Sequence, residues 1–160
     1  MSMYKPVLLC LSTVLILVSC KQSPPAQESA TTSSDEISAE QLEKGIGPIT
    51  QVQLAEDVDD ALARTGEQVF QAKCSACHKL NERYIGPPLF DVTSRRAPEY
   101  IMNMILNPTE MLQKHPTAKE LLAQYNFTPM ADQNLTEAEA RAILEYLREA
   151  GEEAAEETEN

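Results

Sequence analysis

The sequence predicts an all-α domain of about one hundred residues within a chain of 160 residues. Apolar residues recur at three- and four-residue spacing over residues 59–72 and 136–150, which favours amphipathic helices. A CxxCH run, residues 74–78, follows the first of these segments directly. Only 5% of the residues are aromatic and none is tryptophan, so the protein part alone makes a poor core. A bound apolar group would supply the missing mass.

The CxxCH run has the spacing of a covalent haem c attachment site. The sulfurs of Cys74 and Cys77 can each add to a vinyl group of one porphyrin, and the imidazole of His78 can then reach the iron from one side. One run predicts one haem. Zinc sites and redox dithiols use similar cysteine pairs, and these two alternatives remain open. A zinc site needs four ligands, and the only other histidine is His115.

The formal net charge of −12 makes nucleic acid a poor partner, because phosphate binding needs a basic surface. The charge is unevenly distributed. Residues 64–131 have a balance of +2, whereas residues 20–63 carry −7 and residues 132–160 carry −8. The segment around the CxxCH run is therefore the least acidic part, either as a plain solvated surface or as a distinct docking face.

Residues 1–19 are expected to be a signal peptide. Lys5 lies in a short polar start, and residues 7–18 are apolar but too few to span a bilayer stably. The segment ends in LVSC, which resembles the lipobox of bacterial lipoproteins. That resemblance implies cleavage before Cys20 and acylation of this residue as the mature N-terminus; the alternative is an uncleaved membrane anchor.

The four cysteines are then all accounted for. Cys10 is removed with the signal peptide, Cys20 carries lipid, and Cys74 and Cys77 carry haem. No structural disulfide is expected. Export also agrees with haem c, which is attached outside the cytoplasmic membrane.

Residues 20–58 are predicted to be a lipidated flexible tether. The first part, to about residue 44, is rich in Ser, Thr, Pro and Glu, with too little apolar surface to fold. Scattered apolar residues from Gly45 to Leu54 suggest an extended piece that lies against the domain.

A first helix is predicted over residues 59–72, capped by Asp59 or Asp60. Gly66 in its middle costs about 1 kcal/mol relative to alanine, so its presence suggests close contact with another helix. One face of this helix carries Leu62, Gly66, Val69, Phe70 and Lys73.

Residues 84–89 must form a constrained loop, because Pro87 and Pro88 fix φ and remove two donors. The N-terminal half of class I cytochromes c resembles this part of the sequence, which combines Gly66 and Phe70 with the CxxCH run and the Gly86-Pro87 pair. In that family the proline carbonyl accepts the Nδ1 proton of the proximal histidine, which implies this role for Pro87. The alternative is that Pro87 only stiffens the loop.

A second helix is predicted to begin with Pro98 and to run to about Leu106, where Asn107-Pro108 ends it. It resembles the middle helix of the same family. Arg95 and Arg96 precede it, where the resemblance implies contact with a haem propionate. Exposed arginines without such a contact are the alternative.

A third helix is predicted over residues 116–125. Met130 follows it on an irregular segment, and the resemblance implies that this methionine is the sixth iron ligand. Its thioether favours ferrous iron. Other candidates are His115, which is more typical of a surface turn, and three methionines expected to pack on helices, namely Met102, Met104 and Met111.

The last helix has clear end signals. Thr136 and Glu139 can form a capping box, and Gly151 is expected to end the helix as a C-cap. Residues 152–160 are then predicted to be an acidic disordered tail. In the resembling family the first and last helices cross near a glycine and an aromatic pair, which here are Gly66, Phe70 and Tyr146.

The sequence therefore resembles a class I monohaem cytochrome c of the lipoprotein type, with the cytochrome c domain at residues 59–151. The resemblance implies three to five helices around one covalently bound haem, with crossing terminal helices. With both axial positions of the iron filled, it implies an electron carrier rather than an enzyme. A haem enzyme or gas-sensing subunit with a labile sixth ligand is the alternative.

The expected location is the periplasmic face of a bacterial membrane, held by the lipid anchor. The outer membrane is favoured over the inner, because Lys21 stands where some bacteria use aspartate to retain lipoproteins at the inner membrane. The expected donor is a quinol-oxidising complex or another electron donor. The expected acceptor is a terminal oxidase or reductase, such as nitrous oxide reductase.

Overall fold

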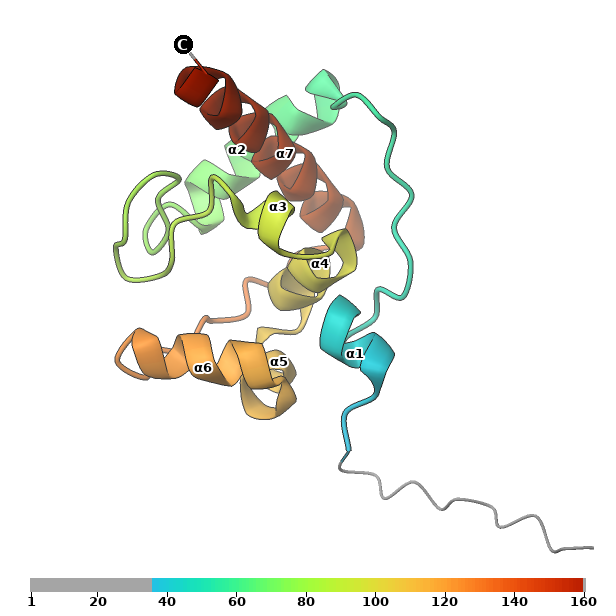
Figure 1. Ribbon diagram of the computed structural model, residues 1–160, viewed down its shortest axis with the longest axis vertical. Helices are drawn as coiled ribbons and strands as arrows, with labels where there is room; N and C mark the ends of the chain where they lie inside the picture. Colours follow the sequence, from blue (N-terminus) through green and yellow to red (C-terminus); the bar gives the residue numbers. More distant parts are fainter. Residues whose placement is uncertain (1–35, 160) are drawn as a thin grey trace, which may run out of the picture. The chain divides into compact units, whose positions relative to one another are not determined.

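The computed structural model describes residues 36–159, and within this range the chain forms seven helices and no strand. The signal peptide, Cys20 and the first part of the tether lie outside the described residues. The predicted all-α class is confirmed, although the helices outnumber the three to five expected. They are α1 (Ala39–Lys44), α2 (Asp60–Lys73), α3 (Val92–Arg95), α4 (Pro98–Leu106), α5 (Pro108–Lys114), α6 (Pro116–Gln124) and α7 (Glu137–Glu159) (Figure 1).

Helices α2 and α7 cross in direct contact, as the resemblance implied (Figure 1). Asp59 caps α2, and its Oδ1 accepts from the backbone of Ala61 and Leu62, each at 3.0 Å. A methyl group at Gly66 would lie 2.0 Å from the Ala142 carbonyl oxygen of α7. Glycine is therefore required here, because any side chain would force the two backbones apart.

The main core lies beside this crossing. The rings of Phe70 and Tyr146 pack with centroids 5.3 Å apart and tilted by 54°, a favourable aromatic geometry. Helix α4, which has the predicted bounds, contributes Ile101 and Ile105 to the same core, and α7 contributes Ile143, Leu144 and Leu147.

The Asn107-Pro108 pair both ends one helix and begins the next. The Asn107 amide donates to the Asn103 carbonyl at 2.8 Å and closes α4. Pro108 then occupies the first turn of α5, where its missing N–H costs nothing. The sequence prediction did not include α5. Met111 on this helix is fully buried in packing, as expected.

The capping box at the start of α7 is confirmed. The Thr136 amide donates to Glu139 Oε2 at 2.8 Å, and the Glu139 amide donates to Thr136 Oγ1 at 3.2 Å. The predicted C-cap at Gly151 and the disordered tail after it are wrong for residues 152–159, because α7 runs to Glu159. This segment is rich in Glu and Ala, which favour helix. Gly151 instead permits close packing: a methyl there would lie 3.1 Å from the Phe90 carbonyl oxygen.

Residues 36–58, here called the N-terminal strap, pack against the domain, so the predicted tether is wrong over this range. Ile46 and Ile49 are buried. The side chain of Asn103 on α4 donates to the carbonyls of Lys44 at 2.9 Å and Ile49 at 2.8 Å, and accepts from the Ile49 amide at 2.9 Å. The expectation that an extended piece after residue 45 lies against the domain is confirmed. The strap folds through these long-range contacts.

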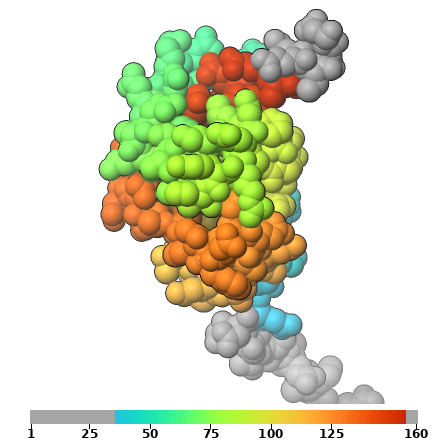
Figure 2. All heavy atoms as spheres, turned by 90° about the vertical axis from the view of Figure 1, so that its left-hand side faces the viewer, coloured from blue at the N-terminus to red at the C-terminus, as the bar shows by residue number. Residues whose placement is uncertain are grey.

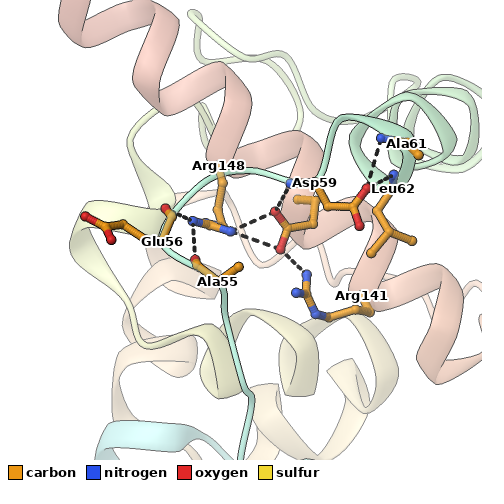
Figure 3. Close-up of polar contacts among 8 residues, drawn as sticks. Ala55, Glu56, Asp59, Ala61, Leu62, Arg141 and Arg148 are labelled. Atoms are coloured by element: carbon orange, nitrogen blue, oxygen red, sulfur yellow. Dashed lines mark hydrogen bonds and ion pairs between the residues drawn. The ribbon is translucent and has the colours of Figure 1, made fainter.

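A buried carboxylate joins the end of the strap to α7 (Figure 3). The side chain of Glu145 is 1% exposed and is paired with the guanidinium groups of Arg141 and, at 2.8 Å, Arg148. Its Oε2 also accepts from the Asp59 amide at 3.2 Å. These contacts compensate the cost of burying the charge. Arg148 in turn donates to the strap carbonyls of Ala55 at 3.0 Å and Glu56 at 2.9 Å.

His115 is buried between α5 and α6, so the expected surface turn is wrong. Its side chain is 1% exposed, and its Nε2–H donates to the Leu42 carbonyl of α1 at 3.2 Å. The ring also meets Tyr100 edge-on, with centroids 5.0 Å apart. Burial lowers the pKa of His115, and the hydrogen bond to Leu42 partly opposes that shift.

This burial predicts a pH dependence for the folded state. The pKa of His115 is lower in the folded than in the unfolded protein, so the unfolded chain binds more protons as pH falls below the ordinary value of about 6.5. The contribution of His115 to the free energy of unfolding is therefore fully present above about pH 6.5 and decreases as the pH falls below that value. The melting temperature of the holoprotein should fall more between about pH 7.5 and pH 5 than that of a His115→Gln variant. Parallel curves for the two proteins would contradict this account.

Candidate haem site

A largely apolar cavity opens between α2, α4, α6, α7 and the two irregular segments that follow α2 and α6. Figure 2 shows the side of the molecule on which these two segments, coloured green and orange, face each other. Every residue that the sequence predicted to bind the cofactor lines this cavity. They are Cys74, Cys77, His78, Pro87, Arg95, Arg96 and Met130.

The CxxCH run forms a tight turn directly after α2. The amides of Cys77 and His78 both donate to the Cys74 carbonyl, at 3.0 and 2.9 Å, so the three side chains are held together. Both thiols are free. Burial raises the pKa of Cys74, and the neighbouring Cys77 raises it further.

The His78 imidazole is oriented by the loop that follows it. Its Nδ1–H donates to the Pro87 carbonyl at 3.1 Å, the contact that the resemblance implied. That bond leaves Nε2 as the nitrogen available to a metal. A methyl group at Gly86 would lie 2.4 Å from His78 Cε1, so only glycine lets the loop approach the ring. Burial lowers the pKa of His78, while the bond to Pro87 acts in the opposite direction.

Two methionines line the cavity, Met130 and Met104. Met130 is half-buried on the irregular segment between α6 and α7, whereas Met104 lies on α4. Met102, Met111 and His115 do not line the cavity. The structure therefore brings Met130 to the site and removes His115 from it.

The two predicted arginines differ in their surroundings. Arg95 is exposed and forms an ion pair with Asp91 at 2.8 Å. Arg96 is half-buried, with its guanidinium carbon 5.4 Å from the Tyr100 ring centroid. Both remain within the cavity lining.

Tyr100 is a site residue that the sequence reasoning missed. It lines the cavity and is 5% exposed, and its buried hydroxyl has no hydrogen-bond partner among the described residues. Such a group costs about 1–3 kcal/mol unless an acceptor is present. An acceptor inside the cavity, such as a haem propionate, would satisfy it. The four-residue spacing from Arg96 was the only sequence signal that could have identified it.

The cavity fits a haem of the c type. It is apolar, it has a thiol pair beside an oriented imidazole, and it contains an orphaned hydroxyl donor. The zinc alternative lacks ligands, because no group of three or more His, Cys, Asp or Glu side chains in residues 36–155 is arranged to hold a metal ion. An all-helical fold around such a cavity defines a domain that binds haem c.

The comparisons identify the family. Residues 63–151, more than half of the chain, match the sequence model of cytochrome c, and the protein belongs to the cytochrome c family. Members of this family are typically electron carriers with one covalently bound haem c. None of the helices in residues 36–159 is long and apolar enough to cross a membrane.

Three similar proteins place the chain within that family. Cytochrome c from Rhodothermus marinus is 55% identical over 71% of this chain and 97% of its own, with a TM-score of 0.68. An engineered form of that protein, bound to a carbene intermediate, is 54% identical with the same coverage and a TM-score of 0.65. A cytochrome c-553-like protein from Synechocystis is 32% identical over 68 residues, 41% of this chain and 65% of that protein's length.

The orphaned hydroxyl gives a direct test of the fit. Tyr100→Phe should destabilise the holoprotein by about 1 kcal/mol, because it removes a satisfied hydrogen bond. Chemical denaturation followed through the haem absorbance measures this. If the hydroxyl has no partner in the holoprotein, its removal should be neutral or stabilising, and that result would overturn the assignment.

Proposed function

We propose that this cytochrome c is a lipid-tethered, monohaem electron carrier whose iron is bound axially by His78 and Met130. The observation that carries the proposal is the convergence of both side chains on one cavity from segments far apart in the sequence. Cys74 and Cys77 would hold the porphyrin through thioether bonds. Pro87 would fix the tautomer of His78, and Tyr100 and Arg96 would face the propionates.

This residue set favours electron transfer over substrate chemistry. The haem, when bound, supplies the one-electron couple. Filled axial positions leave no open site for a substrate, and they limit rearrangement between oxidation states. The hydrogen bond from His78 to Pro87 and the rigid turn at Cys74 keep the proximal side fixed.

Met130→Ala tests the distal ligand. The reduction potential should fall by on the order of 0.1 V, a fraction of the range that axial ligands span, because a soft donor to ferrous iron is lost. The weak long-wavelength band typical of methionine-bound ferric haem should disappear. Met102→Leu is the matched control, because Met102 is buried and does not line the cavity. An unchanged spectrum in Met130→Ala would transfer the assignment to Met104.

A haem enzyme or gas-sensing subunit is the second candidate. Two observations favour it. Residues 128–134, here called the Met130 segment, form hydrogen bonds that reach at most three residues along the chain. The engineered relative from Rhodothermus marinus was solved with a carbene intermediate bound. Both agree with a displaceable sixth ligand. Carbon monoxide binding by the reduced wild-type protein distinguishes the two functions. Fast, tight binding at neutral pH supports the second candidate, and slow, weak binding supports the carrier.

The proposed tether connects the domain to a lipid on Cys20 at the periplasmic face of a bacterial membrane. We propose the outer rather than the inner membrane. Because the strap packs on the domain, only residues 20–35 remain for the tether. Fully extended, they would reach at most about 55 Å. This length would keep the domain at high local concentration near membrane partners. The donor would be a quinol-oxidising complex or another electron donor, and the acceptor a terminal oxidase or reductase such as nitrous oxide reductase.

Cys20→Ser tests the anchor. Wild-type protein made in the presence of a labelled fatty acid should carry the label and lack residues 1–19, whereas Cys20→Ser should carry no label and keep its N-terminus. Cys10→Ser is the matched control and should behave like wild type. An unlabelled wild-type protein with residues 1–19 intact would establish the uncleaved anchor instead.

A further inference from the structure

Arg83 forms a bridge between two segments that lie 41 residues apart in the sequence. It lies on the loop after His78, and its Nη2 donates to the carbonyl oxygen of Gln124, the last residue of α6. Its guanidinium carbon also lies 4.0 Å from the ring centroid of Tyr125.

The chemistry of this bridge suits arginine. The last carbonyls of a helix have no partner within the helix, and they carry the negative end of its dipole. A guanidinium can donate to one of them and stack its plane on an aromatic ring at the same time. Lysine can supply the charge but not the planar stacking.

The bridge connects the two sides of the haem cavity. The loop that carries Arg83 continues into Gly86 and Pro87, which position His78. The end of α6 leads into the segment that carries Met130. Figure 1 shows that loop above the left-hand end of α6, and Figure 2 views the same two segments from that side.

The Met130 segment forms few other hydrogen bonds that could hold it in place. In the part of the chain that the structure describes, the hydrogen bonds found for residues 128–134 reach at most three residues along the chain. Phe127 is 72% exposed and has a φ of 57°. A bulky residue keeps that backbone conformation only where its surroundings hold it, and its amide donates to the Leu122 carbonyl of α6 at 2.8 Å. The position of the segment therefore depends on how the end of α6 is held.

We propose that Arg83 is a positioning residue that holds the Met130 segment closed over the cavity. Its contacts with Gln124 and Tyr125 set how readily Met130 gives up the sixth position to an external ligand. This inference rests on the proposed function, in which Met130 is that ligand. Arg83 itself does not line the cavity.

The test compares Arg83→Gln with Lys119→Gln in the holoprotein. Lys119 is an exposed cation on α6, the helix whose end Arg83 contacts, so its substitution makes the same charge change without removing that contact. The probe is imidazole, titrated against the ferric protein. Arg83→Gln should bind imidazole about five to twenty times more tightly, because a cation–π contact and a helix-end contact are lost. Lys119→Gln should match wild type, and Arg83→Lys should be intermediate.

Hydrogen exchange provides a readout that does not depend on the iron ligand. The amides of Phe127 and Thr128, which donate to Leu122 and Tyr125, should exchange faster in Arg83→Gln than in wild type. Unchanged exchange together with unchanged imidazole affinity would overturn the proposal. An equal effect of Lys119→Gln would also overturn it, because the cause would then be general charge.

A double variant separates this inference from the proposed function. In a Met130→Ala background, Arg83→Gln should no longer change imidazole affinity but should still accelerate exchange at Phe127. If Met130 is not the sixth ligand, the wild-type ferric spectrum will lack the methionine band, and the exchange comparison still decides whether Arg83 holds the segment. If imidazole affinity still changes in the double variant, Arg83 does not act through Met130.

Discussion

The close crossing of α2 and α7 is the constraint on which the rest of this structure depends. Gly66 lets the two backbones touch, and any side chain there would overlap the Ala142 carbonyl. The end of α2 then delivers the CxxCH turn to the cavity, while α7 supplies Ile143 and Leu147 to its lining. The position of the haem attachment site is therefore set by backbone contact between the two ends of the domain.

The N-terminal strap extends the domain beyond the part that matches the family model, which begins at residue 63. Ile46 and Ile49 of the strap are buried in the core, and polar side chains of the helices bind its backbone. Asn103 pairs with its backbone at one end, and Glu145 with Arg148 does so at the other. Detaching the strap would break these hydrogen bonds, each of which contributes about 0.5–1.5 kcal/mol to stability. The loss of these hydrogen bonds is therefore part of the free-energy cost of detaching the strap from the helices.

The two sides of the cavity are built differently. On the side of His78, a tight turn, a hydrogen bond to Pro87 and a close contact with Gly86 orient the imidazole. The distal side is an irregular segment with local hydrogen bonds, attached to the proximal loop through Arg83. The proposed role of Arg83 as a positioning residue follows from this difference, because the irregular segment has no long-range hydrogen bond of its own among the described residues.

The sequence by itself determined the features whose signals lie within a few residues of one another. The CxxCH turn, the Asp59 cap, the capping box at Thr136 and the bounds of α4 are such features, because each depends on local backbone groups. Only the tertiary structure decided the burial of His115, the packing of the strap and the burial of the Tyr100 hydroxyl beside the cavity. These depend on contacts between residues far apart in the chain, and no local pattern encodes which surface will cover a given side chain.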